Sequence, residues 1–200
     1  MSFINKTTIA AFLLVFLNSI SVICQSTIQP SILQAEETWG KEIIKFPVEW
    51  VPEMTLTGFE ELRFAPGWSD PESDRFWTLV MAWSVESAGP LSFEQIERNL
   101  RGYFTGLMIP NHWATDFPDP VLKLRSSETE KESKNLHGTM TLFDGFHTGK
   151  LITVQIRWEQ HYCEEAKRAM VIFRFSPKTF DHPVWKELDA IKKVRNVCEN

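Results

Sequence analysis

The chain has 200 residues, of which 43% are hydrophobic and 24% are charged, and its 21 Lys and Arg against 26 Asp and Glu give a formal net charge of -5 at pH 7. A chain of this length buries enough surface for one substantial domain. The negative balance and the absence of a basic tract argue against a nucleic-acid partner, which would need Lys and Arg to neutralise its phosphates.

Residues 1–24 have the outline of a secretory signal peptide. Lys6 is the one cation in this stretch, and the apolar run IAAFLLVFLNSISVIC follows it. Val22 and Cys24 are tolerable small residues before a cleavage point near Gln25. We therefore expect export to the periplasm or to the extracellular space.

A membrane anchor and a lipid anchor are the two alternatives for this segment. Polar residues interrupt the apolar run at Asn18, Ser19 and Ser21, and the run is shorter than the roughly 20 apolar residues that cross a bilayer. A lipid-attachment signal would place a small residue before the cysteine, whereas Ile23 precedes Cys24. We expect no stable membrane span once the signal has been removed.

The cysteine count predicts one disulfide bond. Cys24 leaves with the signal, so Cys163 and Cys198 remain as an even pair in an oxidising compartment. A bond between them would contribute roughly 4 kcal/mol in the chain-entropy model. The alternative is a pair of buried thiols that never meet.

Residues 25–41 are predicted to be a leader with a helical turn in ILQAEETW, and residues 42–200 to be a single domain. Strands are predicted over residues 42–46 and 59–64, and the second strand ends in a Pro66-Gly67 turn capped by Trp68. Residues 75–86, RFWTLVMAWSVE, are apolar on both alternating sets of side chains. This pattern predicts the central strand of a sheet that is covered on both faces.

A helix is predicted over residues 93–108. Ser92 and Gln95 have the spacing of a capping box, and Leu91 and Ile96 have the spacing of a hydrophobic staple. The apolar stripe of this helix consists of Ile96, Leu100, Phe104 and Leu107. The loop IPNHWATDFPDP follows the helix.

Four more strands and a second helix complete the domain. Strands are predicted over residues 121–126 and 136–143, and residues 149–177 form a hairpin of two long strands joined by a charged bend. A helix is predicted from about residue 183 to 197, with Asp181 or His182 as its cap. The order β-β-β-α-β-β-β-β-α predicts an α+β fold, a mostly antiparallel sheet of about six to seven strands flanked by helices.

These features resemble the Mog1/PsbP-like α/β/α sandwich. The resemblance covers about residues 59 to 197 and rests on the order of elements, the FAPGW turn before a central strand, the glycine-turned hairpin at Gly145 to Gly149, the long strand pair and the closing WKELDAIKKV helix. Members of that group are largely binding or assembly modules, so the resemblance implies a non-enzymatic role. The phrases WGKE, FP and FAPGW are also similar to exported bacterial proteins of uncharacterised function.

The loop after the first helix is one candidate binding site, because long ordered loops on a rigid scaffold often carry binding. Its aromatic rings would stack on a sugar or a peptide while its aspartates accept hydrogen bonds; alternatively, the rings cover the core beside the helix. The candidate residues are His112, Trp113, Asp116, Phe117 and Asp119. Further candidates for contact with a glycan are Trp39, Trp50 and Trp68.

A polar row on the first arm of the hairpin is the second candidate. It consists of Gln155, Arg157, Glu159 and His161, which Arg63 and Arg174 could join. A helix over this face would require partners for the buried charges, whereas an open face would be a concave binding surface. The structural alternative is that these residues only form ion pairs across the strands and bind no ligand.

No catalytic residue follows from a sequence motif, because GxSxG, HExxH, CxxC, P-loop and GxGxxG patterns are missing. The five histidines lack metal-binding spacings, so neither a metal nor a cofactor is expected. The leading hypothesis is an exported, non-enzymatic binding or assembly module with a protein, peptide or glycan partner. The alternative is a small secreted hydrolase whose acid-base pair is His161 with Glu159, beside Arg157, or His112 with Asp116.

Overall fold

The computed structural model describes residues 29–109, 117–125, 136–194 and 198. Within these residues, one antiparallel sheet of seven strands has the order β2-β3-β4-β8-β7-β6-β5. Its strands are β2 Gly40–Phe46, β3 Gly58–Phe64, β4 Leu79–Glu86, β5 Val121–Leu124, β6 Leu136–Asp144, β7 Lys150–Cys163 and β8 Arg168–Ser176. The predicted mostly antiparallel α+β fold is therefore confirmed.

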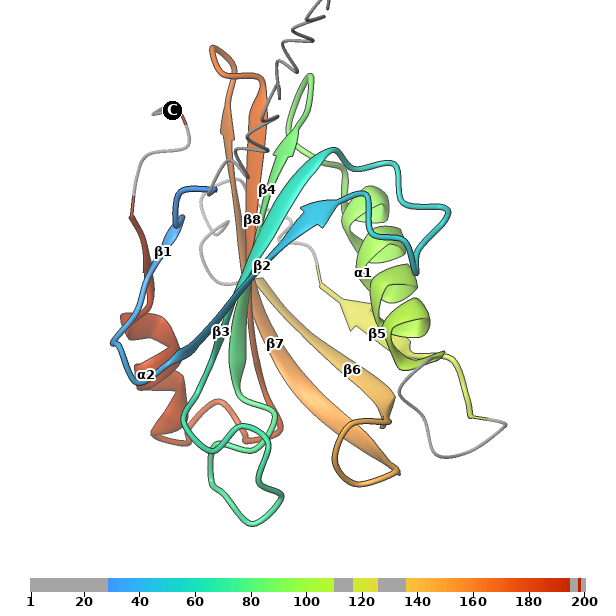
Figure 1. The fold of residues 1–200 in the computed structure, drawn as a ribbon, viewed down its shortest axis with the longest axis vertical. Coiled ribbons are helices and arrows are strands. Elements are labelled where there is room, and N and C mark those ends of the chain that lie inside the picture. Colours follow the sequence, from blue (N-terminus) through green and yellow to red (C-terminus); the bar gives the residue numbers. More distant parts are fainter. Residues whose placement is uncertain (1–28, 110–116, 126–135, 195–197, 199–200) are drawn as a thin grey trace, which may run out of the picture.

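The two helices cover opposite faces of this sheet (Figure 1). Helix α1, Phe93–Met108, packs on one face over the larger hydrophobic core. Helix α2, Val184–Ala190, lies on the other face together with a second sheet of two short strands, β1 Leu33–Gln34 and β9 Lys192–Lys193. Each face of the large sheet therefore has its own core and its own helix.

Strand β4 lies at the centre of the sheet, as its apolar pattern predicts. Seven of its eight residues are buried, and it pairs with β3 on one side and β8 on the other. The strand begins at Leu79 rather than at Arg75, because residues 75–78 form a turn in which the Thr78 N–H donates to the Arg75 carbonyl. Trp77 has a φ of 50° in this turn, a conformation that a strand excludes.

Helix α1 matches its predicted bounds and its predicted cap. The Ser92 hydroxyl accepts a hydrogen bond from the Gln95 N–H at 3.2 Å, and the Gln95 side chain accepts one from the Ser92 N–H at 2.8 Å. Both interactions satisfy backbone groups that the first helical turn leaves unpaired. Ile96, Leu100 and Phe104 are buried against the sheet, and Leu107 is partly buried beside them.

The predicted second helix is too long, because α2 ends at Ala190. Ile191 is extended, and Lys192–Lys193 pairs with Leu33–Gln34 in the small sheet. The guanidinium of Arg174 accounts for this end: it donates to the carbonyl groups of Leu188 and Ile191 at 3.1 and 3.3 Å. Carbonyl groups at a helix end need such partners, and Arg174 provides them from the sheet below.

At the start of α2, neither Asp181 nor His182 is the cap residue; Pro183 holds that position without a side-chain hydrogen bond. Nδ1 of His182 accepts the Val184 N–H at 3.2 Å, so this histidine contacts the first helical residue without being the cap.

The helical turn expected within residues 32–39 is found only at its end, where the Trp39 N–H donates to the Glu36 carbonyl at 3.0 Å; Leu33–Gln34 is strand β1 instead. The buried carboxylate of Glu61 accepts the backbone N–H groups of Ile32 and Leu33 at 2.6 and 3.3 Å. Arg63 donates to the Leu33 carbonyl at 3.0 Å. These contacts hold the segment extended, and Leu33 is only 1% exposed.

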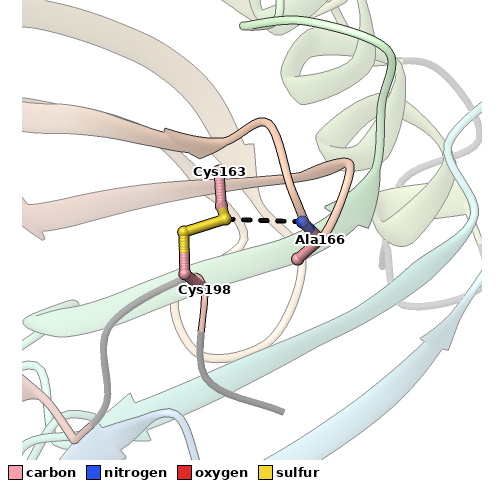
Figure 2. Close-up of a disulfide and its surroundings, with 3 residues drawn as sticks. All are labelled: Cys163, Ala166 and Cys198. Atoms are coloured by element: carbon pink, nitrogen blue, oxygen red, sulfur yellow. Dashed lines mark hydrogen bonds between the residues drawn. A yellow bond between two sulfur atoms is a disulfide. The ribbon is translucent and has the colours of Figure 1, made fainter.

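The predicted disulfide between Cys163 and Cys198 is present, with their Cα atoms 5.2 Å apart (Figure 2). It joins the end of β7 to the C-terminal segment, and the Ala166 N–H donates to the Cys163 sulfur at 3.4 Å. Among the described residues, no helix is long and apolar enough to span a membrane.

Candidate functional site

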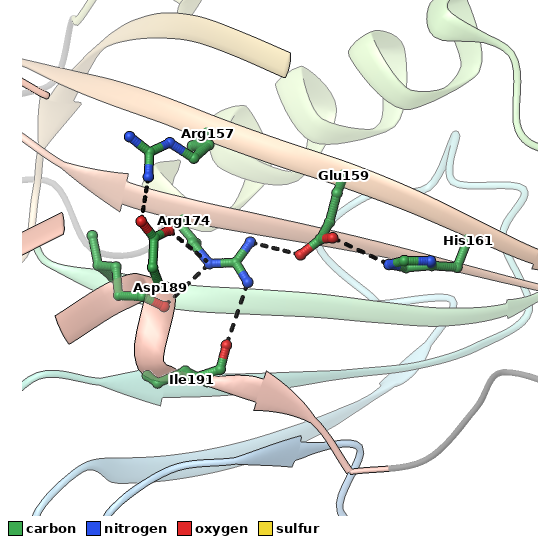
Figure 3. Close-up of polar contacts among 7 residues, drawn as sticks. Arg157, Glu159, His161, Arg174, Asp189 and Ile191 are labelled. Carbon is green, nitrogen blue, oxygen red and sulfur yellow. Dashed lines mark hydrogen bonds and ion pairs between the residues drawn. The ribbon is translucent and has the colours of Figure 1, made fainter. Parts of the chain in front are cut away.

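The polar row of β7 lies on the face of the sheet that carries α2. Register places Arg157 opposite Arg174 and Glu159 opposite Ile172, and successive side chains of a strand alternate between faces. Arg157, Glu159, His161 and Arg174 therefore gather beneath and beside α2 (Figure 3).

Arg174 is the most deeply buried member of this group, at 6% exposure. In addition to the two helix-end carbonyl groups, it donates to Oε1 of Glu159 at 2.9 Å. A buried guanidinium is costly unless its donors are paired, and these contacts pair Nε and both terminal nitrogens. Arg174 therefore joins β7, β8 and the end of α2.

Glu159 lies between two partners, Arg174 and His161. Its second oxygen is 3.2 Å from Nε2 of His161. Burial alone raises the pKa of Glu159, but the hydrogen bonds and charges of His161 and Arg174 outweigh it and hold the pKa at about 2. The carboxylate is thus ionised at neutral pH and is a weak base.

Arg157 is held by a carboxylate and by two aromatic rings. It forms an ion pair with Asp189 of α2. Its guanidinium lies 5.0 Å from the Trp185 ring centroid and 5.4 Å from that of Phe180. These distances are within the range of cation–π attraction. The polar row is thus largely a set of ion pairs between the sheet and α2.

Beyond α2, the same face of the sheet continues over β5, β6 and the first half of β7 and is open to solvent. Leu122 packs into the core under α1, so its neighbours Val121 and Lys123 point to the other side. Register then forms two cross-strand rows, Val121 with Thr141 and Thr153, and Lys123 with Thr139 and Gln155. We call these six residues, together with Leu151, the open face.

A recess of about 310 Å³ lies at the border between the open face and α2. We call it the basic recess. His137 lies beside Phe180, with ring centroids 4.6 Å apart and planes at 29°. Burial, Arg157 and Arg125 all lower the pKa of His137. The recess is lined by Lys123, Arg125, His137, Gly138, Thr139, Gln155 and Phe180.

Of the five predicted loop residues, three lie outside the described residues: His112, Trp113 and Asp116. Phe117 is partly buried and stacks on Phe143, with ring centroids 5.3 Å apart, as the core-covering alternative expects. Asp119 is exposed and lines a groove beside α1 with Arg98 and Arg101.

The other predicted tryptophans are mostly engaged in packing. Trp39 is 8% exposed and belongs to the core under α2. Trp50 contacts Tyr103 edge to face at a ring distance of 5.9 Å. Trp68 lies against Phe64 and His147, with ring distances of 4.4 and 5.0 Å. Trp50 and Trp68 retain partial exposure.

Several residues of the face were not singled out by the sequence: Lys123, Arg125, Thr139, Phe180 and Asp189. The alternation of VLKLR, with Leu122 and Leu124 on one side, could have placed Lys123 and Arg125 together on the other. No local pattern indicates Asp189 or Phe180, because they reach the site through α2 and the segment before it.

The structure also brings together one group with metal-ligating side chains, among the residues that it describes. Ligand atoms of Cys163, Glu165 and Cys198 lie within 4.8 Å of one another. Both sulfur atoms are joined in the disulfide and so are not thiolates. The group therefore does not form a thiolate metal site.

Comparisons of this chain with protein-family models, with curated proteins and with solved structures find no significant match.

Proposed function

We propose that this protein is an exported, non-enzymatic binding module and that its ligand-binding surface is the open face with the basic recess. The observation that carries the proposal is the division of one sheet face into two halves. Under α2 the charged side chains are paired with one another and with backbone groups. Beyond α2 the polar side chains of the open face are exposed or partly exposed, with Thr141 and Thr153 hydrogen-bonded to each other at 2.8 Å, and Val121 and Leu151 are 53% and 56% exposed.

Exposed apolar side chains among polar ones are typical of a surface that meets a partner. Threonine rows and Gln155 supply donors and acceptors on rigid strands, so the ligand would meet a preformed surface. Export is part of the proposal: the apolar N-terminal run and the disulfide both fit an oxidising compartment.

The helices on both faces of an antiparallel sheet support membership of the Mog1/PsbP-like α/β/α sandwich group, which we include in the proposal. The binding and assembly roles of that group agree with a protein, peptide or glycan partner here.

A secreted hydrolase is the second candidate, because His161 and Glu159 are in contact at 3.2 Å. A catalytic base at neutral pH needs a pKa near neutrality, and the pKa of Glu159 is about 2. Glu159 would instead orient His161, leaving the histidine as the reacting group. We rank the hydrolase second because Arg174 holds the other oxygen of Glu159 at 2.9 Å, which makes this pair part of the ion pairs between the sheet and α2.

The test is hydrogen exchange of the protein purified from an exporting host, with and without ligands that copurify with it. We expect protection over residues 121–125, 136–141 and 151–155. Protection confined to α1 or to the 47–57 loop would contradict the proposed surface. Hydrolysis of an ester, peptide or glycoside substrate that is lost in His161→Ala but kept in His182→Ala would favour the hydrolase.

A further inference from the structure

We propose that the basic recess binds an anionic oxygen group, a carboxylate, phosphate or sulfate carried by a small ligand. This inference rests on the proposed binding function and names the chemistry of its ligand. The recess has the volume of a small-molecule site, about 310 Å³.

The charge of the lining carries the inference. Lys123 and Arg125 line the recess, and no carboxylate does so among the described residues. The whole chain has a net charge of -5, so a recess with two cations and no acid departs from the rest of the molecule. Glu159 and Asp189, the acids of the half of this face that lies under α2, are already bound by Arg174 and Arg157.

The spacing of the lining groups suits an oxyanion. Lys123 lies on edge strand β5 and Arg125 follows the end of that strand directly, in a backbone that is still paired with β6, so their Cα atoms are about 7 Å apart on the same side. Thr139 and Gln155 lie in one cross-strand row with Lys123 and offer neutral donors. A guanidinium and an ammonium with added hydroxyl and amide donors form a common carboxylate and phosphate binding set.

The backbone holds these cations in place. A Cβ on Gly138 would lie 2.9 Å from the Lys123 carbonyl oxygen and 2.7 Å from Cδ2 of Leu124. The glycine therefore permits β5 to lie close to β6. The N–H of Arg125 donates to the His137 carbonyl at 2.8 Å, which extends the pairing to the recess.

His137 and Phe180 form the remaining wall. Their stacked rings give the recess an apolar side, against which the organic part of a ligand can pack. Burial is the first cause of the lowered pKa of His137, and the added effect of Arg157 and Arg125 agrees with a positive potential at this place.

The experiment is a titration of the full mature protein that is monitored by two-dimensional NMR. Sodium chloride keeps the ionic strength constant. The probes are inorganic phosphate, sulfate and acetate, and maltose is the neutral probe. We expect at least one anion to shift the amides of residues 123–125 and 137–139 with a saturable curve. Phosphate, sulfate and acetate serve as separate arms that identify which oxyanion is preferred.

Two recess variants and one matched control separate recognition from general charge. Lys123→Gln and Arg125→Gln should each weaken anion binding about tenfold, because each removes a charge-assisted hydrogen bond. Lys45→Gln removes a positive charge from an exposed side chain of β2, at the opposite edge of the sheet. This variant should leave binding unchanged. Thermal unfolding of each variant checks that the fold is intact, and Arg125→Lys should restore part of the affinity.

Equal weakening in Lys45→Gln, or no saturable shift with any anion, would overturn the inference. Maltose binding at the recess with no anion binding would also overturn it while leaving the proposed binding function standing. If copurified ligands protect only amides away from the open face from hydrogen exchange, both the proposed binding surface and the anion site are wrong.

Discussion

Glu60 and Glu61 are adjacent, fully buried carboxyl groups on opposite faces of β3. Glu61 faces the α2 side, where Ser31, Arg63 and two backbone N–H groups satisfy it. Glu60 faces α1, where the Tyr103 hydroxyl donates to it at 2.5 Å and Oε2 has no hydrogen-bond partner. Burial accordingly raises the pKa of Glu60 to about 8, against the lowering effect of Tyr103.

Glu60 should make the protein less stable as the pH rises from 4.5 to 8. The unfolded chain releases this proton near its ordinary pKa of 4.5, whereas the folded protein keeps it until about pH 8. The free energy of unfolding should thus fall by about 1.4 kcal/mol per pH unit in that window. The stabilising contribution of Glu60 is fully present below pH 4.5. Urea unfolding of Glu60→Gln at pH 5, 6, 7 and 8 should show this slope removed.

The control for this prediction is Tyr103→Phe, which removes the hydroxyl and keeps the carboxyl group. Its stability should fall at every pH while the slope remains. An unchanged slope in Glu60→Gln would show that the carboxyl group is not the source of the pH dependence.

Glu159 has the opposite effect on the pH dependence of stability, because its folded pKa of about 2 lies below the ordinary value of 4.5. Its contribution is present above pH 4.5 and is lost as the pH falls through about 2. Glu159→Gln should lower the free energy of unfolding at pH 7 by on the order of 2–4 kcal/mol, since Arg174 loses its carboxylate partner while buried. Urea unfolding measures this, with exposed Glu164→Gln as the control; equal stability of the two variants would contradict it.

Helix α1 depends on a close approach to the loop before β3. A Cβ on Gly106 would lie 2.0 Å from the Trp50 carbonyl oxygen, a distance that the backbone cannot accommodate without moving. Gly106→Ala should lower the free energy of unfolding by about 1–3 kcal/mol, although Ala normally favours a helix over Gly. Thermal unfolding monitored by circular dichroism measures the change.

Gly89, in the loop before α1, is the control for the added methyl group. A Cβ on Gly89 would meet no heavy atom within 4 Å, so Gly89→Ala should change the stability by less than about 0.5 kcal/mol. A stabilised Gly106→Ala would mean that the loop moves freely away from α1.

The C-terminal segment joins the rest of the molecule at two places. Lys192–Lys193 pairs with Leu33–Gln34, and Cys198 is bonded to Cys163 at the end of β7. The N-terminal and C-terminal ends of the described fold therefore meet on the α2 side (Figure 1).

Cys198→Ser should lower the free energy of unfolding by about 4 kcal/mol, because the disulfide restricts a loop with a sequence separation of 35 residues in the unfolded chain. Urea unfolding with and without a reductant tests this. Reductant should lower the stability of the wild type to that of the variant and leave the variant unchanged. A reductant effect on Cys198→Ser would point to a different source.

The elements that the sequence alone determined are those with short-range signals. Each of these signals depends only on residues close together in the chain. They are the alternation along residues 151–162, the apolar side chains on both faces of β4, and the pair Ser92 and Gln95. They were sufficient for the antiparallel sheet, the bounds of α1 and the hairpin of β7 with β8. Cysteine counting was likewise sufficient for the disulfide.

The tertiary structure alone decided where α2 stops, that residues 33–34 form a strand, and that the basic recess exists. Arg174 ends the helix from a neighbouring strand, Glu61 extends β1 from about thirty residues away, and the recess joins Lys123 to Phe180. These outcomes depend on which distant groups supply partners for buried polar atoms. A local pattern does not contain that information, because the partners are chosen by burial in the folded chain.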